Sequence, residues 1–301
     1  WSQVMPPTFQ MMYQGWKIHV SAKALNAKEI LQIVTKTCVT NNVVFKYLRD
    51  VNLLNISNSK RWPRGSSGKF ITIYPLNKEQ FISLLEELYS VLIGFQGPYI
   101  LSDRRYKDCN VLYYRYGGIT KLEKIDHLGN QIPILITPDG ASMPDLRTPG
   151  FILPYWEKDP FIEENNKEDS IPFLKESRYL IMKPLNFGNS GGVYLALDNE
   201  TGEEVVIKEA RPFTQSDSFN NDSVALREKE WRILKKLSHT GLTPRPIDIF
   251  KDWEHTFVVE SLIQGESLQS FLAKNDIHAC YKTNEQRDEY FNNVLQISRN
   301  L

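Results

Sequence analysis

The first half of the chain contains basic and aromatic side chains whose types and spacing suit acid–base chemistry on a phosphate. Lys17 and His19 are two residues apart in a segment that alternates like a β-strand, so their side chains share one face. Lys46 is the one ammonium in the otherwise apolar run 43–48. Desolvation and neighbouring cations lower the pKa of a lysine, as a general base requires. These three residues predict proton transfer at a partly desolvated site.

Further cations and a tyrosine accompany these three residues, and arginine in particular binds phosphate bidentately. Each side chain also has a purely structural explanation, as a strand histidine with its bonds satisfied, a solvated turn arginine or a packed tyrosine. The joint pattern is therefore what indicates a function. The candidate phosphate ligands are Arg64, Lys69, Tyr74, Arg104, Arg105 and Arg115.

The second half contains a glycine-rich turn followed by a lysine on a strand. Gly188 and Gly191 lie where backbone N–H groups can approach phosphate oxygens closely, and Val193 follows as a β-branched residue that can pack on a base. Lys208 ends an apolar strand 15 residues after Val193, and Glu230 on the next helix can reach its ammonium. The alternative is an ordinary ion pair on an amphipathic fold.

Over about residues 178–274 this pattern resembles the N-terminal lobe of protein kinases. Asn186 stands where that family has the first glycine of its loop, and no HRD-like or DFG motif occurs up to residue 301. Residues 288–301 resemble the helix that precedes the catalytic loop, so the resemblance implies a truncated kinase. It also implies ATP and Mg²⁺ as cofactors of this half, with no protein metal ligand assigned. The residues that would bind the nucleotide are Gly188, Gly191, Val193, Lys208 and Glu230.

The first half resembles the bacterial phosphothreonine lyases and, more closely, the lyase domain of class III and class IV lanthipeptide synthetases. The resemblance covers about residues 10–145. The matching runs are Lys-Ile-His at 17–19, Phe-Lys at 45–46, Arg64 ten residues before Tyr74, Ser-Asp-Arg-Arg at 102–105 and Tyr-Arg-Tyr-Gly-Gly at 114–118.

This second resemblance implies a role for each matching residue. Lys46 would remove the α-proton of a phosphorylated Ser or Thr, and His19 would protonate the departing phosphate. Lys17 would stabilise charge on the phosphate or on the enolate-like carbonyl. The residues that would bind the phosphate are Arg64, Tyr74, Arg105 and Arg115, with Arg104 or Lys69 able to replace one of them. The lyase would need no cofactor.

An α+β fold must position these residues, with a phosphothreonine-lyase-like domain followed by a kinase-like lobe of an antiparallel sheet plus one helix. A Pro-rich, acidic stretch separates them and predicts a lyase domain at 1–147, a linker at 148–177 and the kinase-like region at 178–301. Strands are expected at 16–22, 43–48, 70–74, 111–116, 179–185, 193–198, 205–209, 246–250 and 256–261. Helices are expected at 27–38 after Asn26, at 77–94 with Asn77 as the cap, and at 224–237.

Composition narrows the classes of partner. The 36 basic and 36 acidic residues give zero net charge, which argues against a nucleic-acid partner, yet residues 1–150 hold 18 basic against 11 acidic side chains. The three cysteines form no CxxC pair, so neither a disulfide framework nor a zinc site is expected, and cytoplasm is the expected compartment. We expect no membrane helix and no signal peptide.

A lyase followed by a kinase indicates that Ser and Thr residues are phosphorylated with ATP and then dehydrated. The expected partner is a ribosomal lanthipeptide precursor, with a leader and a phosphorylated Ser/Thr core, and class III cannot be separated from class IV. One alternative is a stand-alone lyase acting on phosphorylated host kinases. The other is a phosphopeptide-binding module fused to a degenerate kinase, in which Lys46 and His19 are only phosphate ligands.

Overall fold

The computed structural model describes residues 1–7, 11–162, 173–216, 221–274 and 283–300. It is a mixed α and β structure, as the sequence predicted, and its sheets are antiparallel. The chain divides into two compact units, Trp1–Ser261 and Leu262–Leu301. The predicted boundaries at 147 and 177 both fall inside the first unit and stay a prediction. Residues 163–172 of the predicted linker lie outside the described residues.

The first sheet has six antiparallel strands in the order β1-β3-β4-β2-β6-β5. All four strands predicted before residue 147 are present with slightly different ends, whereas β1 and β5 were not predicted. The strands are β1 Ser2–Val4, β2 Gln14–Val20, β3 Val44–Tyr47, β4 Ile71–Tyr74, β5 Arg104–Arg105 and β6 Leu112–Gly118.

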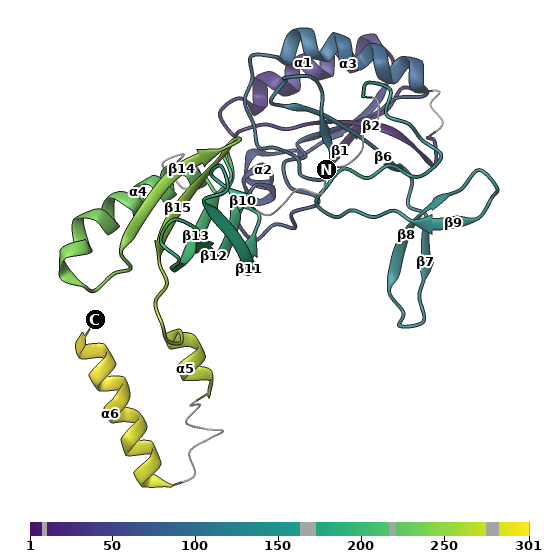
Figure 1. Cartoon of the computed structure of the whole chain (residues 1–301). Helices are drawn as coiled ribbons and strands as arrows, with labels where there is room; N and C mark the ends of the chain where they lie inside the picture. Colours follow the sequence, from purple (N-terminus) through teal and green to yellow (C-terminus); the bar gives the residue numbers. More distant parts are fainter. Residues whose placement is uncertain (8–10, 163–172, 217–220, 275–282, 301) are drawn as a thin grey trace. The chain divides into compact units, whose positions relative to one another are not determined.

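Helices α1 (Ala27–Thr40) and α3 (Lys78–Leu92) lie side by side on one face of this sheet (Figure 1). Their apolar sides pack on strand residues such as Ile18, Phe45 and Ile73, all fully buried. Complete burial of one such side chain contributes roughly 1.5–3 kcal/mol, so this layer fixes which face of the sheet points inward. The lysines and histidine that alternate with these residues must therefore lie on the opposite face.

Both helix starts predicted in this half are confirmed. Asn77 caps α3, because its side chain accepts a hydrogen bond from the backbone N–H of Gln80. Asn26 occupies the N-cap position of α1, but its Oδ1 accepts a hydrogen bond from the backbone N–H of Lys23 instead.

Two short elements that the sequence did not predict border the opposite face of the sheet. One is the helix α2 (Val51–Ser57), which Asp50 caps through the N–H of Leu53. The other is a separate three-stranded sheet, β7 (Glu123–Ile125), β8 (Gln131–Ile136) and β9 (Ser142–Pro144). The helix spans only about two turns, and Pro133 in β8 and Pro144 in β9 argue against strands in the sequence.

The second sheet of the first unit is also six-stranded and antiparallel, in the order β10-β11-β12-β13-β15-β14. With α4 (Ser223–Leu237), it forms the predicted antiparallel sheet plus one helix, and a turn joins β12 to β13. Asp222 caps α4, and a 3-10 turn, Ser238–Thr240, follows it. The strands are β10 Phe173–Leu174, β11 Tyr179–Gly188, β12 Gly191–Asp198, β13 Glu204–Ala210, β14 Pro246–Asp252 and β15 His255–Ser261.

The second unit contains the helices α5 (Leu268–Lys274) and α6 (Asn284–Asn300). The helix predicted at 288–301 is confirmed as the greater part of α6, and Leu301 lies outside the described residues. In the part of the chain that the structure describes, no helix is both long and apolar enough to cross a bilayer.

Candidate active site

Strand register brings the basic residues of the first half into adjacent rows on one face of the sheet. Thr72 on β4 pairs with both Lys46 on β3 and His19 on β2, so these three side chains form one row across three strands. In the next row, Lys17 on β2 pairs with Arg115 on β6. Residues directly opposite one another on neighbouring strands point to the same side, so both rows face away from α1 and α3.

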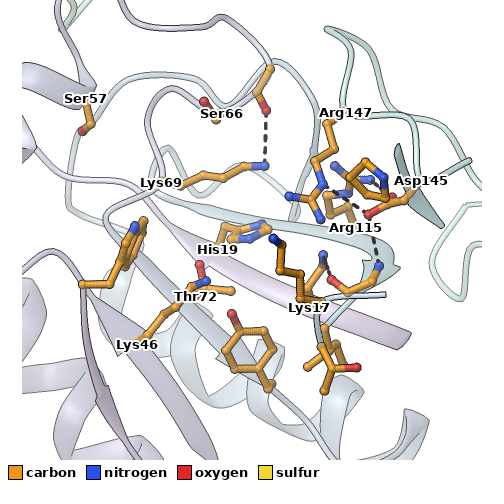
Figure 2. A pocket seen from close by; sticks show the side chains of 18 of the residues that line it. Lys17, His19, Lys46, Ser57, Ser66, Lys69, Thr72, Arg115, Asp145 and Arg147 are labelled. Carbon is orange, nitrogen blue, oxygen red and sulfur yellow. Dashed lines mark hydrogen bonds and ion pairs between the residues drawn. The ribbon is translucent and has the colours of Figure 1, made fainter. Parts of the chain in front are cut away.

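These rows form one wall of a cavity of about 610 Å³. Figure 2 shows Lys17, His19, Lys46 and Lys69 around this cavity, with Arg115, Asp145 and Arg147 gathered on one side of it. Other parts of its lining come from α2, from the loop 62–69 and from residues 118–123. Six of the nine predicted lyase residues line it, namely Lys17, His19, Lys46, Lys69, Tyr74 and Arg115.

His19 and Asp103 form a buried hydrogen bond between Nδ1 of the imidazole and Oδ2 of the carboxylate. Burial lowers the pKa of His19 to about 3, against the opposing attraction of Asp103. Burial acts to raise the pKa of Asp103, but His19 and Lys69, whose Nζ lies 3.3 Å from Oδ1, outweigh it and lower this pKa. A neutral imidazole that donates from Nδ1 to an ionised Asp103 leaves Nε2 for the cavity.

Lys46 stands among cations and aromatic rings. Its Nζ lies 5.0 Å from the centre of the Trp1 ring and 5.7 Å from that of Tyr74. Within the described ranges, no carboxylate lies at ion-pair distance from it. Burial lowers the pKa of Lys46, and the nearby charges of Arg147 and Lys69 lower it further. The amine is therefore easier to deprotonate than an ordinary lysine.

Lys17 and Tyr74 are more deeply buried than Lys46. Nζ of Lys17 donates to the carbonyl of Gly118 at 2.8 Å, and burial followed by the charge of Arg115 brings its pKa well below the ordinary value. Burial raises the pKa of the Tyr74 phenol, which keeps it neutral and able to donate a hydrogen bond.

Arg115 is held by a buried carboxylate. Its Nη2 donates to Oδ1 of Asp145 at 3.0 Å, and its Nε donates to the carbonyl of Tyr116 at 3.2 Å. The other oxygen of Asp145 lies 3.3 Å from Nε of Arg147, whose side chain remains more than half exposed. Asp145 thus fixes one guanidinium inside the cavity and contacts a second that is open to solvent.

Three predicted phosphate ligands do not line this cavity. Nη1 of Arg104 lies 2.5 Å from Oδ2 of Asp159. Arg105 forms a bidentate ion pair with Glu254, with 2.7 Å between Nη2 and Oε2. The guanidinium of Arg64 lies 4.8 Å above the ring of Phe187.

Alternation along the segment 102–105 explains the placement of Arg104. Arg104 pairs with Tyr114, on the face covered by α1 and α3, whereas Asp103 reaches His19 on the opposite face. Arg105 pairs with Tyr113 in the row of His19, and its ion pair with Glu254 keeps it out of the cavity. The sequence analysis included this run but assigned no role to Asp103. The need of a buried histidine for a carboxylate partner was the signal that could have indicated it. Asp145 and Arg147 gave no local signal.

Two residues of the predicted nucleotide site, Lys208 and Glu230, contact each other. Nζ of Lys208 lies 2.8 Å from Oε1 of Glu230, as predicted, and also 2.7 Å from Oε1 of Glu260, which was not predicted. Burial acts to lower the pKa of Lys208, but the two carboxylates outweigh it and raise this pKa. Val193 pairs with Lys208 across β12 and β13.

The glycines of the hairpin between β11 and β12 also have a packing role. Gly188 pairs with Gly191, which has φ +138°, and a Cβ on Gly191 would lie 2.2 Å from the carbonyl oxygen of Glu209. The backbone N–H of Gly192 donates to Oε2 of Glu209 at 2.8 Å. A glycine at position 191 is therefore required by close backbone approach, whether or not a phosphate binds there.

Comparisons with known proteins agree with the resemblance drawn from the motifs of the first half. A curated relative from Streptomyces coelicolor, "Probable SapB synthase", is 39% identical over 275 residues, and the match covers 91% of this chain and 30% of the relative. The match to a solved kinase domain covers 36% of this chain and 31% of the kinase chain, with 17% sequence identity and a TM-score of 0.29. A family model described as RamC, N-terminal domain, matches residues 1–171. The chain therefore belongs to the RamC N-terminal domain family, consistent with a fragment of a class III lanthipeptide synthetase.

Proposed function

We propose that the cavity around Lys46 and His19 eliminates phosphate from a phosphorylated Ser or Thr of a peptide, as the dehydration step of lanthipeptide biosynthesis. The observation that carries this proposal is the pairing pattern inside the cavity. Asp103 and Asp145 bind His19 and Arg115, whereas Lys46 has no carboxylate at ion-pair distance among the described residues. Lys17 likewise forms no ion pair there, but its Nζ donates to the carbonyl of Gly118, so Lys46 is the lysine better placed to remove a weakly acidic proton.

Recognition of the substrate follows from the charge of the cavity. A phosphate monoester carries close to two negative charges at neutral pH, and it would be met by Lys17, Lys69 and Arg115. Asp145 fixes the guanidinium of Arg115 in advance, which lowers the entropy lost when phosphate binds. The neutral phenol of Tyr74 supplies a further donor.

The reaction is a β-elimination in which Lys46 and His19 move the protons. The neutral amine of Lys46 takes the proton from Cα, the C–H electrons form the Cα=Cβ bond, and the Cβ–O bond breaks. The bound phosphate dianion raises the pKa of Lys17, and the resulting ammonium stabilises the enolate-like carbonyl that develops as the proton leaves. The departing phosphate takes a proton from Nε2 of His19, which gives dehydroalanine from phosphoserine or dehydrobutyrine from phosphothreonine, together with inorganic phosphate.

His19 must carry that proton before it can donate it, although burial lowers its pKa to about 3 without a ligand. A phosphate dianion beside Nε2 raises this pKa, because it stabilises the imidazolium. Asp103, bound to Nδ1, stabilises the same charged form and fixes the ring orientation. Substrate binding thus prepares the acid as well as placing the leaving group.

In this proposal the phosphorylated residue comes from a kinase activity to which the second sheet contributes. The contact of Lys208 with Glu230 fits an ammonium held ready for the phosphates of ATP, and Val193 beside it fits a base-packing position. When bound, Mg-ATP supplies the transferred phosphoryl group. The residues of this chain would orient that group and neutralise part of its charge.

The chain can be tested with a phosphoserine peptide deuterated at Cα. Elimination predicts a product that has lost phosphoric acid and contains dehydroalanine without the α-deuterium, as measured by mass spectrometry. A phosphatase would instead give serine that keeps the deuterium. Peptide that binds but stays unchanged would support the phosphopeptide-binding alternative, and either of these two results refutes the lyase proposal.

A further inference from the structure

A second cavity, of about 590 Å³, lies between the segment 60–64 and the tip of the hairpin that joins β11 to β12. Its lining includes Lys60, Arg61 and Arg64 and no acidic residue. In the part of the chain that the structure describes, Lys60 and Arg61 form no ion pair with a carboxylate, and Nε of Arg64 is buried without a hydrogen-bond partner. Three uncompensated cations within five residues favour an anion at this place.

Hydrogen bonds fix both walls of this cavity. The hairpin residue Asn189 is fully buried, with its N–H donating to the carbonyl of Lys60 at 2.9 Å and its Nδ2 to that of Ser59 at 3.1 Å. Arg211 donates to both the carbonyl and Oδ1 of Asn189. Only backbone atoms of residues 59–60 take part in this network, so the side chains of Lys60 and Arg61 stay free for a ligand.

The second cavity borders the candidate active site. Trp62 lines both cavities, and Gly65 and Ser66, which follow it closely, line the catalytic one. Trp62 and Phe187 are partly exposed aromatic rings on the walls of the second cavity, and such rings suit contact with a peptide. A peptide held in the catalytic cavity could therefore continue past Trp62 into the second one.

We propose that the second cavity binds the phosphoryl group of another phosphorylated Ser or Thr on the same peptide while one residue occupies the catalytic cavity. This inference rests on the proposed function. It commits to a phosphopeptide rather than to the phosphates of a nucleotide, because Trp62 and the residues after it connect the cavity to the catalytic one. The consequence is that a peptide phosphorylated at two places binds more tightly than one phosphorylated once.

Calorimetry on the Lys46→Ala variant measures binding without turnover. The probes are peptides with one phosphoserine and with two, separated by about two to six residues, a range that spans neighbouring cavities in extended chain. We expect at least one doubly phosphorylated peptide to bind about tenfold more tightly than the singly phosphorylated one. Adding Lys60→Ala and Arg61→Ala should reduce this advantage to less than about twofold.

The matched control instead adds Lys28→Ala and Lys36→Ala. These substitutions remove the same amount of positive charge from exposed positions of α1, on the other face of the sheet. This control should keep the full advantage. Equal affinities of the singly and doubly phosphorylated peptides would overturn the inference. So would loss of the advantage in the α1 control, which would indicate only a general effect of charge.

A nucleotide is the competing ligand, and Mg-ADP tests it on the same variants. Weaker Mg-ADP binding after Lys60→Ala and Arg61→Ala, with an unchanged advantage for the doubly phosphorylated peptide, would assign the cavity to the nucleotide and overturn the inference. Elimination by the unmodified chain is measured separately. Elimination without any affinity advantage refutes this inference alone, whereas an advantage without elimination supports phosphoryl binding here and refutes the proposed chemistry.

Discussion

Lys46 and Lys208 are two half-buried lysines on strands of different sheets, and their surroundings differ in one respect. Lys208 contacts two carboxylates, those of Glu230 and Glu260, whereas no carboxylate among the described residues lies at ion-pair distance from Lys46. The pKa of Lys208 is therefore raised and that of Lys46 is lowered. The comparison teaches that the placement of carboxylates decides whether a lysine stays a cation or becomes available as a base.

Carboxylates lie near the first cavity, but they form ion pairs with residues other than Lys46. Asp103 binds His19 and lies near Lys69, and Asp145 binds Arg115. Asp103 and Asp145 are outnumbered by the lysines and arginines of this site, so a net positive charge remains around Lys46 until a phosphate enters. The same arrangement thus favours binding of a dianion and lowers the proton affinity of the amine.

Substitution of Lys46 gives the largest expected effect. Lys46→Arg keeps the positive charge but removes the base, so elimination should fall by about 10³-fold while phosphopeptide affinity stays within about threefold. Product formation is followed by mass spectrometry and binding by calorimetry. A Lys46→Arg variant with more than a tenth of normal turnover would show that Lys46 is not the base.

Arg115 and Arg105 form the next test, because only the first lines the cavity. Arg115→Lys loses the planar guanidinium, so the KM for a phosphopeptide should rise about tenfold. The matched substitution Arg105→Lys should change KM less than about twofold, since that side chain binds Glu254. Equal effects on KM would contradict the placement of these two arginines.

Lys208→Met tests the other half of the comparison. The variant leaves the carboxylate of Glu260 buried without its cation, which should cost roughly 1–3 kcal/mol in the free energy of unfolding. Denaturant unfolding measures this loss. Elimination from a phosphoserine peptide should stay within about twofold below the unfolding transition, and a large loss of elimination would mean that the two sites are not independent.

The pH dependence gives the smallest expected effect. Lys46 must be deprotonated to act, so kcat/KM should rise with pH through a lysine pKa that lies below the ordinary 10.5. Burial and then the charge of Arg147 lower this pKa, so Arg147→Ala should raise it and move the rise to higher pH. A pH–rate profile that does not move, or moves to lower pH, would exclude Arg147 as a contributor.

The sequence predicted those parts of the site that depend on local pattern. Alternation placed Lys17 and His19 on one face, and the apolar run around Lys46 predicted a desolvated lysine, as the structure confirms. It did not distinguish Arg115 from Arg104, because the face of a strand residue is set by its register with distant strands. The carboxylates were missed for the same reason, since Asp145 is 30 residues away from Arg115.

The fold shows a similar division. Long elements with a clear period and a cap, such as α3 after Asn77, were predicted within a few residues. The helix α2 and the strands β7 to β9 were not. The helix spans only about two turns, and β8 and β9 contain Pro133 and Pro144, which argue against a strand. Lys208 and Glu230 were paired correctly because the distance from a strand to the next helix is short and regular, whereas Glu260 arrives from a later strand.

The ion pair of Arg105 with Glu254 has a consequence for inheritance and protein engineering. The two residues are 149 positions apart, and the aromatic rings of Tyr99, Tyr113 and Trp253 surround the guanidinium. A chimaera that takes the first half from one relative and the second from another would combine an arginine and a carboxylate selected in different contexts. Such a chimaera is therefore expected to fold well only when its first half has an arginine at position 105 and its second half has a carboxylate at position 254.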